Sequence, residues 1–242
     1  MTAETSPDSD LLSLTCCAPE GDHSRSALLV IKDLTGKNKS VCSVFGRLNS
    51  DFKTYVLESP LPSVDEVAEY SDTLSQTLLN SGVRRATVFG IGAGATVAQS
   101  LAIIAPKVVR RLVLLDATPR LAPGFLCKTV DRIERFLPLG LPLRRLRAHY
   151  DSRPMLHRIH CPTLLLLSKQ AGQYEQQQAQ YIRSKIPNSW FKRISNIYNE
   201  DRTEFSEELQ ELLTTFLQVP VKRPQKIKTE TSASSHKVRN HA

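Results

Sequence analysis

The sequence predicts an α/β protein with a mostly parallel central sheet and helices on both faces. Short aliphatic runs alternate with segments whose apolar residues recur at helical spacing. The runs are almost continuously apolar, which is typical of parallel strands buried on both faces. Such alternation implies right-handed crossovers between neighbouring strands. With 242 residues, 40% of them apolar, the chain is long enough to bury a core of this kind.

Seven segments are expected as strands because they are short, rich in aliphatic residues and bounded by turn residues. The first is an edge strand near the N-terminus, and the other six belong to the body of the sheet. They are 11–17, 27–32, 54–58, 86–90, 111–116, 163–168 and 190–195.

Helices are expected between these strands. The first long one is predicted to begin at Ser63 as its N-cap, with Glu66 completing a capping box, and to end at Gly82. Its apolar face is expected to include Val67, Leu74, Leu78 and Leu79 among others. Further helices are predicted at 40–48, 95–105, 174–185 and 206–217.

Breaks in this rhythm divide the chain into three parts. Residues 1–26 form an N-terminal segment, 27–217 the main domain, and 218–242 a basic tail that is expected to be disordered. Within the domain, residues 118–160 are rich in Pro and Gly and interrupt the alternation. They are interpreted as an insertion with two short basic amphipathic helices, 128–137 and 143–150.

The net charge of +8 is concentrated in this insertion and in the tail. Residues 118–158 hold nine basic and three acidic residues, and the tail holds six and one. The rest of the chain therefore carries a net charge near −3. A localised basic patch attracts anionic surfaces or acidic proteins, although a solvated surface is the commoner reason for such charge.

The sequence shows no apolar run of membrane-spanning length and no signal-peptide pattern, so a cytoplasmic protein is expected. The cysteines are scattered and lack metal-ligand spacing, which favours free core thiols over a metal site. No metal and no cofactor is predicted. The five cysteines are Cys16, Cys17, Cys42, Cys127 and Cys161.

A glycine-rich turn joins the strand at 86–90 to the helix that follows it. Gly90, Gly92 and Gly94 alternate there with Ile91 and Ala93. The pattern is that of a G-x-S-x-G nucleophile elbow, in which flanking glycines permit a sharp strand-to-helix turn and the central residue adopts a strained backbone. Here the central residue is itself a glycine, which relieves the strain and offers no nucleophile.

A dinucleotide-binding loop is the alternative interpretation of these glycines, with Asp116 as the acidic residue on the next strand. The third glycine comes one position early for a G-x-G-x-x-G motif. The loop also follows several strands instead of the first one. Both points favour the elbow.

The stretch from Gly82 to Pro119, with the glycine turn and the following L-V-L-L-D strand, resembles the central part of the α/β-hydrolase superfamily. Residues 159–168 resemble the strand after the lid of that family, and 205–217 its last helix. The similarity covers roughly residues 27–217 and implies an α/β-hydrolase fold, with the insertion at 118–160 as a short helical lid.

The same resemblance implies a vacant catalytic triad. The nucleophile position falls at Gly92. The stretch where the acid is expected, 168–175, contains only Glu175, and the histidine position falls near Asn199. No histidine lies between His160 and His236. Because the three residues act as a unit, their joint loss predicts a catalytically inactive protein.

Other polar residues are weighed against this prediction. Asp116 is interpreted as structural, and His157 and His160 as surface residues. Glu200 and Asp201 would fall in the histidine loop and could form a noncanonical acid/base pair with Glu175. The remaining candidates, interpreted as solvated, are His149, His236, His241, Arg144, Arg145 and Arg147.

Three hypotheses remain for function. The first is an inactive α/β-hydrolase-fold protein that binds a small hydrophobic or acyl-like ligand or a protein partner. The second is a noncanonical enzyme of this fold, esterase-, thioesterase- or lyase-like, with a rebuilt active site. The third is a scaffold that recruits an acidic partner through the basic insertion and tail.

The first hypothesis places a ligand above Gly92, because open α/β sheets bind at the carboxyl ends of their strands. An aspartate at position 33 would repel an oxyanion where the family usually has a His-Gly pair. Apolar residues of the insertion, including Leu126 and Leu137, favour a hydrophobic ligand. The predicted pocket consists of Asp33, Leu34, Ile91, Gly92, Ala93, Phe125 and Phe136.

Overall fold

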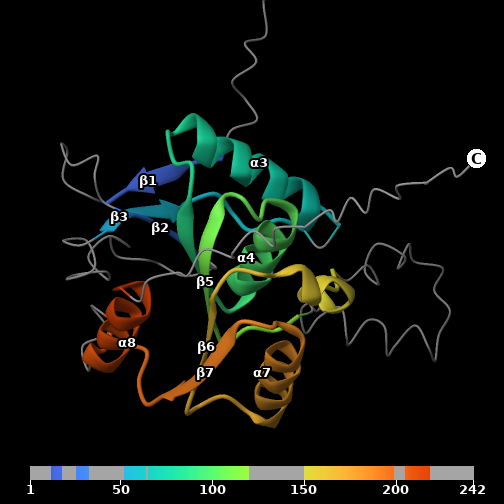
Figure 1. Ribbon diagram of the computed structural model, residues 1–242, viewed down its shortest axis with the longest axis vertical. Helices are drawn as coiled ribbons and strands as arrows, with labels where there is room; N and C mark the ends of the chain where they lie inside the picture. Colours follow the sequence, from blue (N-terminus) through green and yellow to red (C-terminus); the bar gives the residue numbers. More distant parts are fainter. Residues whose placement is uncertain are drawn as a thin grey trace, which may run out of the picture.

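The computed structural model describes residues 12–17, 26–32, 52–63, 65–119, 150–198 and 205–218. A single sheet forms the centre of this part of the molecule (Figure 1). Its spatial order is β1-β3-β2-β4-β5-β6-β7. β1 lies antiparallel to β3 at one edge, and every other neighbouring pair is parallel. The mostly parallel sheet predicted from the sequence is thus confirmed.

All seven expected strands are present, with bounds that differ from the predicted ones by a few residues. They are β1 (Leu14–Cys16), β2 (Ser26–Lys32), β3 (Phe52–Leu57), β4 (Ala86–Ile91), β5 (Val109–Leu115), β6 (Thr163–Ser168) and β7 (Ser189–Ile194).

Four α-helices and one 3-10 helix accompany these strands in the described part of the chain. They are α3 (Val67–Asn80), α4 (Ala93–Ile104), η2 (Arg153–Arg158), α7 (Gln173–Lys185) and α8 (Glu207–Gln218). The helices predicted at 40–48 and 128–137, almost all of the one at 143–150, and the tail after Gln218 lie outside the described residues.

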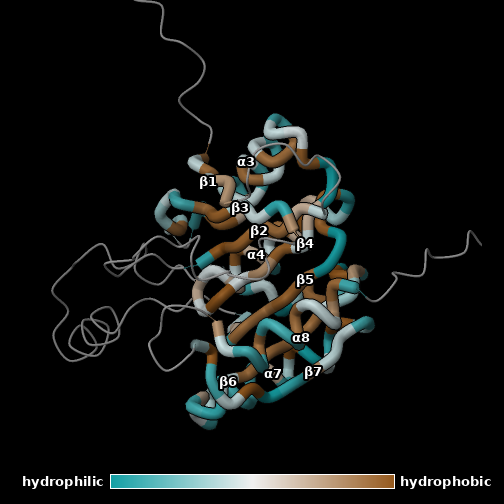
Figure 2. Tube along the Cα trace, turned by 90° about the vertical axis from the view of Figure 1, so that its left-hand side faces the viewer, coloured by the Kyte–Doolittle hydropathy of each residue, from teal (hydrophilic) through white to brown (hydrophobic). Residues whose placement is uncertain are grey.

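The sheet buries one apolar layer on each face because successive strand residues point to opposite sides. In β2, Leu29 and Ile31 pack with the layer formed by α3, α4 and α7, whereas Leu28 and Val30 pack with α8. The strands accordingly appear as the brown interior of the fold in Figure 2, with hydrophilic residues gathered toward the outside. Helices therefore cover both faces, as predicted.

The start of α3 differs from the prediction. Ser63 is not its N-cap: the helix begins at Val67, and Glu66 occupies the N-cap position without a side-chain capping bond. The backbone N–H of Glu66 instead donates to the Ser63 carbonyl, which closes a separate turn before the helix. Leu79, expected on the buried face, is 49% exposed because it lies one residue past Leu78 in the last turn.

The C-terminal end of α3 follows the prediction. Gly82 adopts a φ of +77°, and its N–H and that of Val83 donate to the carbonyls of Leu79 and Leu78. A residue with positive φ at this position satisfies carbonyl groups that the helix leaves unpaired, and glycine does so without steric cost.

The cysteines correct another expectation. Cys17 is disulfide-bonded, so the prediction of free core thiols is wrong for this residue. Cys16 is free but exposed, and Cys161 is free and partly buried. Among the described helices, none is long and apolar enough to cross a membrane.

Candidate functional site

A sharp turn around Gly92 connects the carboxyl end of β4 to α4. Gly92 is the N-cap of α4 and has φ 57° and ψ −120°, a backbone conformation that strongly favours glycine. Its N–H donates to the Leu115 carbonyl at 3.0 Å, and its carbonyl accepts from the N–H of Ala95 at 3.1 Å. The turn therefore holds the start of α4 against the end of β5.

The flanking glycines are required by close packing. A Cβ at Gly90 would lie 2.5 Å from Ala95 Cα and 2.7 Å from Ala98 Cβ. A Cβ at Gly94 would lie 2.7 Å from the carbonyl carbon of Ile31. These positions bring α4 against β2 and β4 with no room for a side chain, as the elbow pattern predicts.

Gly92 differs from its two neighbours because nothing lies within 4 Å of the place where its Cβ would be. The position is therefore constrained by backbone conformation but not by packing. In a nucleophile elbow this is the point from which the catalytic side chain projects.

A cavity of about 500 Å³ opens next to this point, at the carboxyl ends of β4, β5 and β6. Segments from five parts of the described chain meet there. Its described lining is Gly92, Ala93, Asp116, Thr118, Ser168, Gln170, Ala171, Gly172, Tyr174 and Glu175.

Asp116 and Ser168 join two strand ends beside the cavity. The Asp116 carboxylate accepts a hydrogen bond of 2.8 Å from the backbone N–H of Ser168. The N–H of Asp116 donates in turn to the Leu166 carbonyl at 3.0 Å. Asp116 has a φ of +48°, which aspartate tolerates better than most residues. The bond supports the structural interpretation of Asp116, although its carboxylate also faces the cavity.

The first turn of α7 supplies the opposite wall. Tyr174 is 51% exposed there, and Glu175 is partly buried. The Glu175 Oε2 atom lies 2.9 Å from the position that a Cβ on Gly172 would occupy, so the carboxylate folds back over the N-terminus of the helix. An acidic group in this position is stabilised by the helix dipole.

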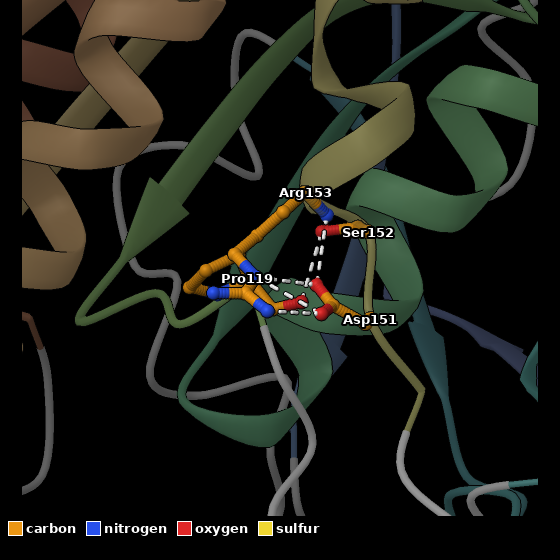
Figure 3. Close-up of polar contacts among 4 residues, drawn as sticks. All are labelled: Pro119, Asp151, Ser152 and Arg153. Atoms are coloured by element: carbon orange, nitrogen blue, oxygen red, sulfur yellow. Dashed lines mark hydrogen bonds and ion pairs between the residues drawn. The ribbon is translucent and has the colours of Figure 1, made fainter.

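Below the cavity, a buried polar network joins the two ends of the insertion. Gln99 donates to the Thr118 carbonyl at 3.1 Å and accepts from the Ser152 hydroxyl at 2.8 Å. Ser152 also contacts the Pro119 carbonyl through its N–H and its hydroxyl. Figure 3 shows this carbonyl close to Ser152.

Beside this network, Asp151 binds the Arg153 guanidinium through both carboxylate oxygens, at 2.6 to 2.9 Å (Figure 3). The same carboxylate accepts from the backbone N–H of Arg153. The chain thus leaves and re-enters the sheet at a fixed point on α4.

Of the pocket residues predicted from sequence, Gly92 and Ala93 line the cavity. Ile91 is partly buried and packs against the apolar layer under α8. The other four predicted pocket residues, and all the triad-loop and arginine candidates, lie outside the described residues. These are Asp33, Leu34, Phe125, Phe136, Asn199, Glu200, Asp201, Arg144, Arg145 and Arg147.

The histidines that the structure describes lie away from the cavity. His157 is exposed in η2, and His160 is exposed just before the amino end of β6, where its carbonyl accepts from Asn188. Both therefore fit the interpretation of surface residues. His149, His236 and His241 lie outside the described residues.

Sequence reasoning did not place Thr118, Ser168, Gln170 or Tyr174 in the pocket. A usable signal existed, because each follows the end of a predicted strand or begins the next helix. The carboxyl ends of parallel strands meet at one edge of the sheet. Polar residues just after those strands are the natural candidates for lining that edge.

The sequence matches no protein-family model and no curated protein. Solved structures do match. MenH from S. aureus aligns with a TM-score of 0.61 at 17% identity, over 84% of this chain and 97% of its own. The enol-lactonase from Burkholderia xenovorans aligns with a TM-score of 0.60 at 15% identity, over 85% and 96%.

An α/β hydrolase from a Medee basin deep-sea metagenome, MGS-M2, aligns with a TM-score of 0.61 at 15% identity, over 89% of this chain and 97% of its own. Together with the sheet order and the glycine turn, these similarities show that the chain has the α/β-hydrolase fold.

Proposed function

We propose that this protein is not a serine hydrolase and that it binds a small ligand in the cavity beside Gly92. The observation that carries the proposal is the open space at Gly92, where the fold would otherwise project its nucleophile. Covalent hydrolysis needs a side-chain nucleophile with a base in hydrogen-bond reach. Glycine supplies no such group.

The rest of the cavity supports the same view. Its described lining contains no histidine and no cysteine, although three residues there carry hydroxyl groups. The sequence has no histidine between His160 and His236, which leaves the expected histidine position near Asn199 without a base. A hydroxyl without a base remains a weak nucleophile at neutral pH.

Retention of the cavity favours ligand binding. A volume of about 500 Å³ falls in the range of small-molecule sites. The structural neighbours include a hydrolase and an enol-lactonase by name, so the fold houses small-molecule sites elsewhere. The described lining has small or polar side chains and no large aliphatic one, which favours a compact polar ligand over an acyl chain.

The first test is hydrolysis of a broad set of esters and thioesters by the purified protein and by Gly92→Ser. We expect no turnover by either, because serine at position 92 would still lack a histidine. Turnover by the natural protein that disappears in Glu175→Gln would overturn the proposal in favour of a noncanonical enzyme.

The second test addresses binding at the cavity. Ala93→Phe places a ring in the cavity without altering a residue of positive φ, and it should abolish binding of any ligand found by screening. Ile104→Phe, at the 41% exposed far end of the same helix, is the matched control and should bind as the natural protein does. Equal binding by both variants would place the ligand elsewhere.

A further inference from the structure

We infer that the cavity beside Gly92 binds a small organic cation, an ammonium group on a compact stem. The inference rests on the proposed ligand-binding function and names its ligand class. Four features carry it: two carboxylates, a buried hydroxyl without a partner, an exposed aromatic ring, and the position of the nearest described lysine.

The charged groups in the described lining are both negative. Asp116 stands at the end of β5 and Glu175 in the first turn of α7, and both face the cavity. Neither forms an ion pair among the described residues. The one described lysine at the end of a neighbouring strand, Lys32 of β2, places its Nζ 5.8 Å from the ring centre of Tyr198.

Two helix N-termini also face this space, and they oppose the carboxylates only in part. A helix N-terminus carries the equivalent of about half a positive charge. Glu175 already offsets that of α7, while α4 has no acidic residue in its first turn. Two full negative charges therefore exceed the dipoles, and the cavity favours a cation over an anion.

Ser168 gives an independent indication of a ligand. Its side chain is buried, with 9% exposed, and it lines the cavity. Its backbone N–H donates to Asp116 and its carbonyl accepts from Ala171. Its hydroxyl, however, has no hydrogen-bond partner in the described part of the chain. Since buried polar groups are nearly always paired, a polar ligand atom is the natural partner for this hydroxyl.

Tyr174 supplies an aromatic face beside these polar groups. Its ring is 51% exposed, lines the cavity and makes no ring or cation contact with other described residues. An ammonium group over such a ring gains roughly 0.5–1 kcal/mol at an exposed site. A carboxylate on either side and a ring on one wall form an arrangement suited to a tetraalkyl or primary ammonium group.

The experiment compares three molecules of the same shape by calorimetry and ligand-observed NMR. Choline is the cation, 3,3-dimethylbutan-1-ol its neutral analogue, and 3,3-dimethylbutanoate the anion. We expect choline to bind roughly tenfold more tightly than the alcohol, and the anion to bind more weakly still.

The variants test which groups carry this preference. Glu175→Gln should reduce the preference for choline roughly fivefold, and Tyr174→Leu should reduce choline affinity two- to fivefold, in line with the usual cation–π strength of roughly 0.5–1 kcal/mol. Glu211→Gln, on the exposed surface of α8, is the matched carboxylate control and should change neither. Thermal unfolding of each variant checks that the fold is intact.

The outcomes separate this inference from the proposed function. Equal or tighter binding of the alcohol or the anion overturns the cation inference but leaves ligand binding standing. Failure of choline to bind also overturns it, while Ala93→Phe and its control still judge any other ligand. Ester turnover by the natural protein would overturn the proposed function itself.

Discussion

The Ser152 hydroxyl donates a hydrogen bond of 2.8 Å to the side-chain oxygen of Gln99, and both side chains are fully buried. The two residues are 53 positions apart in the sequence. Through Gln99 the same network reaches the Thr118 carbonyl, so it fixes both ends of the insertion to the middle of α4. A buried network of this kind is costly to break at one member.

Ser152→Ala should lower the free energy of unfolding by about 1–3 kcal/mol, because the Gln99 oxygen would remain buried without its donor. Chemical denaturation measures the change. Ser184→Ala, which removes an exposed hydroxyl on α7, should change stability by less than about 0.5 kcal/mol. A Ser152→Ala effect no larger than that of the control would contradict the importance of the network.

Asp116→Ala should destabilise the protein by about 1–3 kcal/mol, since the Ser168 N–H would lose its acceptor. Asp116→Asn keeps an acceptor oxygen and a residue that tolerates positive φ, so its effect should stay below about 1 kcal/mol. Urea titration of both variants tests the pair. Similar losses in both would show that the charge of the carboxylate, and not its geometry, stabilises this corner.

The three elbow glycines should respond differently to alanine. Gly90→Ala and Gly94→Ala place a Cβ against backbone atoms and should destabilise strongly or prevent folding. Gly92→Ala enters open space and meets only backbone strain, which costs roughly 1–3 kcal/mol. Thermal unfolding ranks the variants. A Gly92→Ala variant as damaged as the other two would mean that the turn is more crowded than the structure shows.

Cys161 should make stability depend on pH at the alkaline end. Burial raises the pKa of its thiol from 9.0 to about 11. The unfolded chain therefore loses this proton at lower pH than the folded protein, and the associated stability is full below pH 9 and lost between about pH 9 and 11.

Comparison with Cys161→Ser isolates this contribution. The stability of the natural protein relative to the variant should fall across that pH window and stay constant below it. Alkylation gives a second readout, because exposed Cys16 should react with iodoacetamide at pH 8 well before Cys161 does. A difference that grows with rising pH would contradict the sign.

Arg111→Met should destabilise the end of α8. The guanidinium is 3% exposed, donates to the Leu217 carbonyl and lies 5.9 Å from the ring centre of Phe216. Desolvation, and after it the charge of Arg110, lowers the pKa of this guanidinium. Loss of the charged hydrogen bond should cost about 1–3 kcal/mol in guanidinium chloride unfolding. Lys107→Met, at an exposed position, should have little effect.

Much of the fold could be predicted from the sequence because its signals are local. The aliphatic runs at 27–32 and 163–168 became β2 and β6 with almost the same bounds. Glycines with one backbone requirement were also interpretable, as Gly82 and the flanks of Gly92 show. The N-cap of α3 was not, since a Ser-x-x-Glu pattern fits both a capping box and the turn that Ser63 and Glu66 actually form.

The candidate site was predictable only in part. The sequence by itself determined that position 92 has no side chain and that no histidine lies between residues 160 and 236, because these are statements of composition. Only the tertiary structure decided which groups surround that position. Asp116, Ser168 and Glu175 lie in different crossover units, and they meet because parallel strands end at one edge of the sheet. Their separation along the chain carries no local signal, so the acidic cavity and the unpaired hydroxyl emerge only once the strands are assembled.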